Sequence, residues 1–362
     1  RQLLDAYALI YRAYYAFIKN PRINSKGFNT SAILGFVNTL EEVLKKENPT
    51  HIGVAFDPAG PTFRHEAFEQ YKAQREETPE AIRLSVPIIK EIIRAYRIPI
   101  LEVAGYEADD VIGTLATEAG RQGIITYMMT PDKDYGQLVS DKVFMYRPKH
   151  TGGFEVMGVD EVKAKFDIQS PAQVIDMLGL MGDSSDNIPG CPGVGEKTAQ
   201  KLIAEFGSIE NLLEHTDQLK GALKTKVETN REMITFSKFL ATIKIDVPIQ
   251  LDMDSLVREQ ADEDSLRQIF EELEFRTLID RVLKKENAGN GITTPTGNKT
   301  AAEKSNLAPL PLFPEEGGAV QGDLFANFTG NEPGEAKNSN LATLETLNCD
   351  YQLIDTEEKR TK

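Results

Sequence analysis

Nine carboxylates lie in five places where an apolar segment of the sequence ends. They are Asp5, Asp57, Glu107 with Asp109 and Asp110, Asp132 with Asp134, and Asp183 with Asp186. An open α/β sheet binds ligands beyond the carboxyl ends of its strands, so we expect these acids to converge on one edge of a sheet. Carboxylates that lie close together raise one another's pKa unless cations compensate them. Two Mg²⁺ or Mn²⁺ ions, about 3.5–4 Å apart, would suit these oxygen ligands and the hydrolysis of a phosphodiester.

Each acid taken alone also has an ordinary structural explanation. Asp57 precedes a proline, as turn residues often do, and Asp109 and Asp110 are placed to cap a helix. Because acids occur at five separate segment ends, the ordinary structural explanation is less convincing for the whole set. Other chemistry lacks suitable residues, because none of the four histidines follows a predicted strand and Cys191 and Cys349 have no zinc spacing.

Three cations are placed to hold a phosphate near these acids. The stretch 58–97 contains no predicted strand, and within it Lys72 and Arg75 would share one face of a helix. Arg12 comes two helical turns after Asp5. We interpret these side chains as a cationic lid over the acidic edge. A solvated helix face, and an ordinary surface position for Arg12, are the alternatives.

A glycine-rich run leads into a predicted helix that begins near Gly195. Glycine lets a backbone approach a ligand closely, and the free N–H groups at the start of a helix bind phosphate. The run resembles a helix-hairpin-helix, which grips duplex DNA without reading its sequence. A tight turn between helices is the alternative. The residues that we expect to contact DNA here are Gly190, Gly193, Val194, Gly195, Lys197 and Thr198.

The composition is that of a globular protein and excludes a membrane span. The chain has 362 residues and a net charge of −15, with 40% hydrophobic and 27% charged residues. No apolar run reaches the roughly 18–20 residues that a transmembrane helix needs, and the sparse cysteines predict a cytoplasmic protein. The acidic balance would disfavour a nucleic-acid partner. Metal ions, backbone amides and a few local bases would supply that affinity instead.

Predicted strands alternate with helices in the first part of the chain, and helices alone follow. We expect strands at Leu3–Leu4, His51–Phe56, Ile98–Val103, Ile124–Met129 and Val143–Tyr146. This alternation predicts an α/β fold with a mostly parallel sheet. Later helices are expected at Asp160–Phe166, Pro171–Met181, Gly195–Phe206, Ile209–Leu213, Lys226–Ile245 and Asp264–Phe275. The expected domains are 1–158, a helical part at 159–285, a disordered linker at 286–340, and the start of a truncated domain at 341–362.

Several of these motifs together resemble the flap-endonuclease family of 5′–3′ exonucleases, in particular the 5′ nuclease domains of bacterial DNA polymerases I. The resemblance covers about residues 1–285, and the tail from about residue 341 resembles the start of the 3′–5′ exonuclease-like domain that follows in those polymerases. The segments that carry it are Leu4–Tyr14, Phe56–Asp57, Thr62–Arg64, Tyr71–Arg75, Gly105–Asp110, Asp132–Asp134 and Gly182–Gly190.

The resemblance implies a PIN-like α/β nuclease with a helical arch at about 58–97, followed by a helix-three-turn-helix. It implies two Mg²⁺ or Mn²⁺ ions that cut 5′ ends, flaps and RNA primer ends at nicked or gapped duplex DNA during replication and repair. By position, the more tightly held ion would be bound by Asp57, Glu107, Asp109 and Asp110, with Asp5 and Asp132 beside it. The second ion would be bound by Asp134, Asp183 and Asp186. The scissile phosphate would be contacted by Arg12, Lys72 and Arg75. Arg64 would contact DNA, and Tyr71 would stack on a base. The turn Gly190–Gly195 would hold the duplex, with a K⁺ ion.

Two residues depart from the family pattern, since Ala6 and Pro131 replace glycines beside the expected metal ligands. No ligand is lost, so we expect little effect. An active nuclease is therefore favoured over a degenerate member that only binds branched DNA. A PIN-type ribonuclease is a weaker alternative, because it has no need of the glycine-rich duplex grip.

A short peptide in the expected linker, Gln321–Phe325, resembles the motif by which bacterial replication proteins dock on the sliding clamp. Leu324 and Phe325 would fill an apolar pocket, and Gln321 would form hydrogen bonds at its rim. Large apolar residues in a polar stretch call for an explanation of this kind. A chance match or packing on the core is the alternative.

Overall fold

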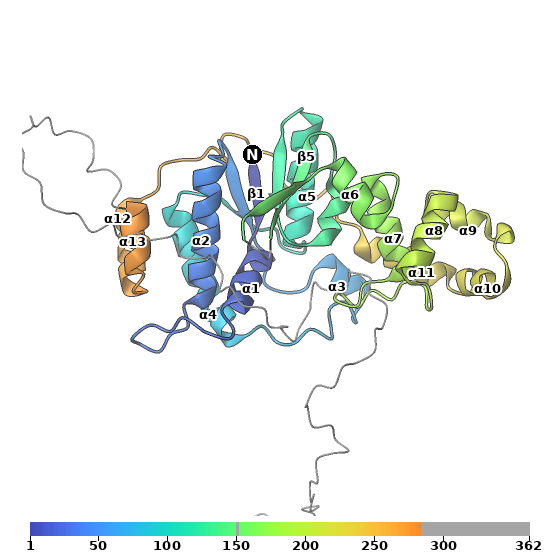
Figure 1. Ribbon diagram of the computed structural model, residues 1–362, viewed down its shortest axis with the longest axis horizontal. Helices are drawn as coiled ribbons and strands as arrows, with labels where there is room; N and C mark the ends of the chain where they lie inside the picture. Colours follow the sequence, from blue (N-terminus) through green and yellow to red (C-terminus); the bar gives the residue numbers. More distant parts are fainter. Residues whose placement is uncertain (150–151, 284–362) are drawn as a thin grey trace, which may run out of the picture. The chain divides into compact units, whose positions relative to one another are not determined.

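The computed structural model describes residues 1–149 and 152–283, and its core is a six-stranded sheet with the order β3-β2-β1-β4-β5-β6 (Figure 1). The strands are β1 (Gln2–Asp5), β2 (Ile52–Ala55), β3 (Ile100–Leu101), β4 (Thr126–Met129), β5 (Val143–Pro148) and β6 (Phe154–Met157). All neighbours are parallel except the β5–β6 pair. Leu4 of β1 is in register with Val54 of β2 and Met129 of β4, so the carboxyl ends of these three strands lie side by side.

Helices cover both faces of this sheet because the central strands are apolar on both sides. One face packs with α1, α2 and α4 around Leu4 and Val54, and α5 packs across β1 and β4 on the other. The expected mostly parallel α/β architecture is thereby confirmed. The helices of this part are α1 (Ala6–Ala16), α2 (Ser31–Lys46), α3 (Phe63–Ala67), α4 (Glu80–Ala95), α5 (Ala108–Arg121) and the 3-10 turn η1 (Lys133–Leu138).

Residues 159–241 form the expected helical part, in which α7 packs against α11 and α8. The helix expected at Lys226–Ile245 is two helices, because Asn230 leaves the helical conformation and its side chain donates to the carbonyl of Lys226 (2.8 Å). The elements are α6 (Val159–Phe166), η2 (Pro171–Gln173), α7 (Val174–Met181), α8 (Glu196–Phe206), α9 (Ile209–Glu214), η3 (Thr216–Gln218), α10 (Gly221–Thr229) and α11 (Arg231–Ala241).

Two segments pack against parts of the chain that the expected domain boundaries had separated from them. The second half of the stretch 58–97 is α4, whose buried stripe of Ile82, Ile89 and Ile92 belongs to the sheet core. The last helices, α12 (Glu263–Glu272) and α13 (Arg276–Leu283), lie beside α2 and α4 (Figure 1) and add Phe270 to that core. Only the residues before α4 are left for the predicted arch, and the helical part ends before α12.

Three predictions concern residues outside the described part: the linker at 286–340, the tail at 341–362 and the docking peptide Gln321–Phe325. Within the described part, no helix is long and apolar enough to cross a membrane.

Candidate active site

The N-termini of two helices fix the positions of two strand-end acids, Asp5 and Asp57. Asp5 caps α1, with one oxygen accepting from the Ala8 N–H (3.1 Å) and the other from the Tyr135 hydroxyl (3.0 Å). Asp57 accepts from the N–H of Ala108 (2.7 Å), the first residue of α5. A carboxylate is favoured at both places, because the first N–H groups of a helix have no partner within the helix. The fold therefore aims both carboxylates at the same edge of the sheet.

Glu107, Asp109 and Asp110 form a compact group at the start of α5. One oxygen of each lies within 4.8 Å of the others, which is a suitable cluster for a metal ion. Asp110 differs from its neighbours because it is fully buried and both its oxygens are engaged, by Arg64 and by the backbone N–H groups of Glu107 and Lys244. Asp110 therefore supports the group from inside, whereas the half-buried Asp109 faces the site.

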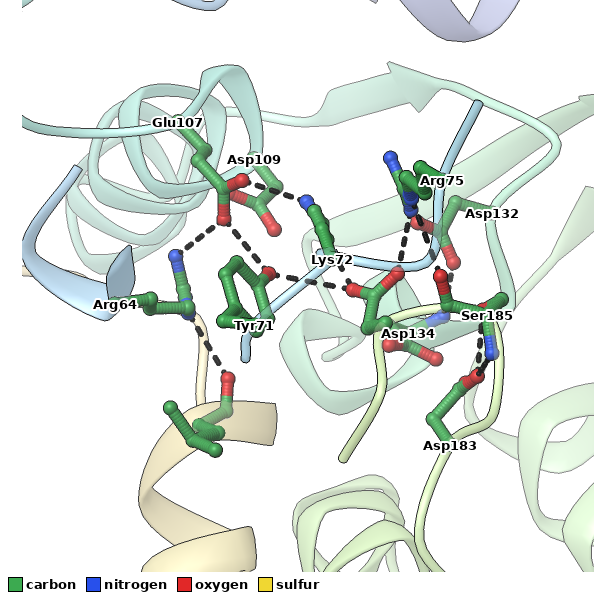
Figure 2. A network of polar contacts seen from close by, with 12 residues as sticks. Arg64, Tyr71, Lys72, Arg75, Glu107, Asp109, Asp132, Asp134, Asp183 and Ser185 are labelled. Atoms are coloured by element: carbon green, nitrogen blue, oxygen red, sulfur yellow. Dashed lines mark hydrogen bonds and ion pairs between the residues drawn. The ribbon is translucent and has the colours of Figure 1, made fainter. Parts of the chain in front are cut away.

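Arg64 does not occupy the DNA-contacting position predicted for it. Its side chain is 1% exposed and donates to Glu107 (2.8 Å) and to both oxygens of Asp110 (2.8 Å). It also donates to the carbonyls of Leu240 and Thr242 at the end of α11. The residue thus ties α3, α5 and α11 together beneath the acids (Figure 2), and the prediction was wrong.

The remaining acids come from η1 and from the turn after α7. Asp132 accepts from the N–H of Asp134 (2.9 Å), and Asp183 accepts from the N–H of Ser185 (2.8 Å). Figure 2 shows Asp132, Asp134 and Asp183 on the side of Lys72 opposite Glu107 and Asp109. One buried oxygen of Asp134 has no hydrogen-bond partner in the described part of the chain, as expected of an oxygen that awaits a ligand.

The nine carboxylates act electrostatically as one group. Burial, and then the charge of Asp57, raises the pKa of Asp5 to about 7. Burial, with Asp132 and Asp183 as neighbours, raises the pKa of Asp134 well above its usual range. Hard divalent cations fit this donor set, because they prefer carboxylate oxygens and compensate the repulsion. Since a metal displaces the bound protons, metal affinity should rise with pH through the range of the raised pKa values.

Two cations reach into this group of acids. Lys72 Nζ lies 2.6 Å from Glu107 and 3.8 Å from Asp186, and Arg75 pairs with Asp186. Burial is the largest single influence and opposes ionisation, but Lys72 together with Arg64 lowers the pKa of Glu107, and Lys72 together with Arg75 lowers the pKa of Asp186. The structure thus brings the predicted Lys72 and Arg75 to the acids.

Two further basic residues, Arg12 and Lys133, have different surroundings. Arg12 donates to the carbonyl of Lys149 (2.8 Å), at the end of β5. Lys133, to which the sequence reasoning gave no role, pairs with Asp183 at 2.7 Å. Its position between Asp132 and Asp134 was the only signal for it in the sequence.

Tyr71 is also placed differently from the prediction. Its side chain is 3% exposed, and its hydroxyl donates to Glu107 (3.0 Å) and Asp186 (3.3 Å), so its ring offers no face for a base. Tyr135, which the sequence reasoning missed, similarly lies buried under Asp5. No pattern in the sequence singles out either tyrosine as a partner of the carboxylates.

The glycine-rich turn is divided between a buried and an exposed part. Gly190 is buried against Gly182, and its N–H donates to the Ser237 hydroxyl (2.9 Å), so the prediction that it contacts DNA was wrong. Val194 is also buried (4% exposed). The exposed part of the turn leads into the first turn of α8, whose N–H groups lie outside the ladder of helix hydrogen bonds. The exposed part of the turn consists of Gly193, Gly195 and Lys197, and the neighbouring Thr198 is half-buried.

Comparison with known proteins gives matches over most of the described chain. Residues 2–167 match the model of the 5′–3′ exonuclease N-terminal resolvase-like domain, and residues 169–264 match that of the 5′–3′ exonuclease C-terminal SAM fold. DNA polymerase I of Bacillus caldotenax is 41% identical over 283 residues, which are 77% of this chain and 32% of that protein. The chain thus spans about a third of the length of this relative.

Solved structures of bacteriophage T5 proteins share the fold. The 5′-exonuclease with bound divalent metal ions (zinc) has a TM-score of 0.56 at 21% identity, covering 76% of this chain and 98% of that one. The flap endonuclease in a pseudo-enzyme–product complex with DNA and metal ions has a TM-score of 0.55 at 22% identity, covering 76% and 100%.

Proposed function

The chain belongs to the 5′–3′ exonuclease family, and from this premise we propose that it hydrolyses phosphodiester bonds at 5′ ends and 5′ flaps of DNA with the help of divalent metal ions. One observation carries the proposal: carboxylates from separate strand ends and from the turn after α7 lie together around Lys72, Arg75 and Lys133 (Figure 2). Carboxylates this close together repel one another, and divalent cations would relieve that repulsion. The T5 relatives, whose structures hold metal ions and DNA, support the assignment.

The donor set divides into two groups, each suited to one Mg²⁺ or Mn²⁺ ion. Asp57, Glu107 and Asp109 would hold the first, with Asp5 and Asp132 beside it. The second would be held by Asp134, Asp183 and Asp186. A bound pair of ions lowers the pKa of a water molecule and stabilises the leaving oxygen. Asp110, whose oxygens are engaged by Arg64, orients Glu107 instead of binding an ion.

The residues between α3 and α4 would bind the phosphate that is cleaved. Lys72 and Arg75 already reach the carboxylates, so an anion at the metals would lie within their range. Lys72 has a backbone φ of 56°, a left-handed conformation that is uncommon for a lysine. Its backbone N–H donates to the carbonyl of Asp186 (3.0 Å), which holds the side chain over the site. Both cations would neutralise charge that develops on the phosphate oxygens.

Replacing Lys72 with alanine should lower the single-turnover cleavage rate by about 10²-fold, because a cation aimed at the developing charge is lost. The rate is measured on a 5′-flap substrate with enzyme in excess. Lys90→Ala is the matched control, because Lys90 pairs with Glu102 outside the acidic group and should leave the rate unchanged. Equal rates for the Lys72 variant and the wild type would remove this role.

The exposed part of the glycine-rich turn would hold the duplex through backbone N–H groups, with a K⁺ ion coordinated by its carbonyls. Gly193 has a φ of 77°, and a Cβ there would lie 2.6 Å from Lys226 Nζ. Gly193→Ala should weaken duplex binding about tenfold, because the backbone must move away from the phosphate. Gly207→Ala is the control, since Gly207 has the same kind of φ (80°) at the other end of α8 with nothing nearby. Equal affinities of the two variants would return the turn to a purely structural role.

The relatives support a proposal about the cellular role. We propose that this chain is the 5′ nuclease part of a DNA polymerase I, and that it removes RNA primers and flaps in replication and repair in the cytoplasm. The peptide Gln321–Phe325 would dock the enzyme on the sliding clamp. A pull-down with the clamp, comparing Leu324→Ala/Phe325→Ala with the wild type, tests that partner.

A flap-cleavage assay over a range of Mg²⁺ and Mn²⁺ concentrations tests the proposed activity. We expect cleavage that depends on the metal and leaves 5′-phosphates. Tight binding of flap DNA without cleavage at any metal concentration would leave only the alternative, a protein that recognises branched DNA.

A further inference from the structure

One buried tyrosine contacts carboxylates from both of the groups that we propose to bind metal ions. Tyr71 lies in the segment between α3 and α4, and its side chain is 3% exposed. Its hydroxyl oxygen lies 3.0 Å from Oε2 of Glu107, which belongs to the first group (Figure 2). The same hydroxyl lies 3.3 Å from Oδ2 of Asp186, which belongs to the second group. A single side chain thus connects the ligands of the two ions.

Each of these carboxylates offers one oxygen to Tyr71 and the other to a cation. Oε2 of Glu107 accepts from Tyr71 and Arg64, whereas Oε1 lies 2.6 Å from Lys72 Nζ. In Asp186, Oδ2 lies next to Tyr71 and Oδ1 pairs with Arg75. When Lys72 and Arg75 turn to a phosphate, as the proposed function requires, Oε1 and Oδ1 become available to metal ions.

Tyr71 differs from Lys72 and Arg75 because its hydroxyl carries no charge. An ammonium or guanidinium group repels a divalent cation, whereas a tyrosine hydroxyl is neutral near pH 7 and donates one hydrogen bond. The hydroxyl can therefore keep its contact with one carboxylate oxygen while the other oxygen binds an ion. Groups that hold metal ligands by hydrogen bonds in this way commonly raise metal affinity by roughly 10–100-fold.

The surroundings of Tyr71 fix the position of its hydroxyl. The ring meets the ring of His65 edge to face, with 5.2 Å between their centroids. The preceding residue, Gln70, is tied to the turn that carries Asp186, because the side chain of Asn187 donates to the Gln70 carbonyl (2.6 Å). Tyr71 is thus held in place relative to Asp186, as a residue that orients this carboxylate must be.

We propose that Tyr71 is a positioning residue for both metal ions, whose hydroxyl orients Glu107 toward the first ion and Asp186 toward the second. The inference rests on the proposed function, since it takes divalent metal ions as the ligands. Because the hydroxyl has only one proton, the two carboxylates share it. Its removal should therefore weaken the binding of both ions.

The test measures the binding of Mn²⁺ to the metal-free protein by isothermal titration calorimetry, in the absence of DNA. Tyr71→Phe removes the hydroxyl and keeps the ring, so its packing against His65 is retained. We expect this variant to bind both ions about tenfold more weakly than the wild type. Tyr96→Phe is the matched control, because the buried Tyr96 donates to the carboxylate of Glu41, outside the acidic group, and its loss should leave Mn²⁺ affinity unchanged.

Electron paramagnetic resonance gives a signature that a purely structural role would not change. At a Mn²⁺ concentration that just fills both sites of the wild type, we expect the spectrum of two spin-coupled ions. Tyr71→Phe should lose most of this signal at the same concentration, and Tyr96→Phe should retain it. Circular dichroism is used to choose a temperature at which all three proteins are folded.

A second measurement distinguishes the hydroxyl from the ring. The affinity for 5′-flap DNA without metal ions should be the same for Tyr71→Phe and the wild type, because the variant loses only a contact with carboxylates. A weaker affinity for DNA together with normal Mn²⁺ binding would mean that the hydroxyl contacts the substrate, and would overturn the positioning role.

Failure of this inference differs from failure of the proposed function. If the wild type binds two Mn²⁺ ions and cleaves flap DNA but Tyr71→Phe has the same Mn²⁺ affinity and spectrum, the role of Tyr71 is wrong and the nuclease remains. If the wild type binds no Mn²⁺ and does not cleave, the proposed function itself fails.

Discussion

Replacing Asp109 with alanine is expected to reduce the single-turnover rate of flap cleavage by about 10³-fold, while the affinity for duplex DNA stays close to that of the wild type. The half-buried Asp109 faces the site beside Glu107 (Figure 2). Burial, and then the neighbouring Asp110, raises the pKa of Asp109 well above its usual range. Its carboxylate therefore has little to do in the protein except to bind a cation. The duplex grip that we propose at the start of α8 does not include Asp109 and should be unaffected.

Asp141→Ala is the matched control for this variant. The Asp141 side chain is 85% exposed and lies outside the acidic group, so both its rate and its affinity should equal those of the wild type. A rate for Asp109→Ala within tenfold of the wild type would show that this carboxylate is not a metal ligand.

Replacing Arg64 with methionine is expected to lower the free energy of unfolding by about 3–5 kcal/mol, because it leaves the buried Asp110 without its counter-charge and Glu107 with Lys72 alone. Asp110 is fully buried and Glu107 is 5% exposed, so water cannot replace the guanidinium. The bonds from Arg64 to the carbonyls of Leu240 and Thr242 would be lost as well. Urea unfolding at neutral pH, followed by circular dichroism, measures the change.

Arg83→Met provides the comparison, since the exposed Arg83 pairs with Glu77 and Glu80 on the surface and should change stability by less than about 1 kcal/mol. A similarly small effect for Arg64→Met would mean that Arg64 is accessible, and would restore the prediction that it contacts DNA.

The position of the carboxylates was predictable from the sequence because it depends on one general property of parallel sheets. Strands that run in the same direction end at the same edge, so acids such as Asp5 and Asp57 meet even though they are far apart in the chain.

The predictions for Arg64, Tyr71 and Gly190 were wrong because their roles depend on distant partners. Arg64 is 46 residues from Asp110, and Gly190 is 47 residues from Ser237. The family resemblance suggested that Arg64 and Tyr71 face DNA, and the glycine-rich run suggested an exposed backbone at Gly190. Tertiary packing decides whether such groups face solvent, and local sequence patterns do not report on tertiary packing. The same is true of α12, which returns to the core of the sheet.

The most direct test of the account is a crystal structure of the protein soaked in Mn²⁺, with anomalous differences recorded near the manganese edge. The account predicts two peaks about 3.5–4 Å apart, one among Asp57, Glu107 and Asp109 and the other among Asp134, Asp183 and Asp186. Carboxylates that stay paired with Lys72 and Arg75 at saturating Mn²⁺, with no anomalous peak between them, would contradict it.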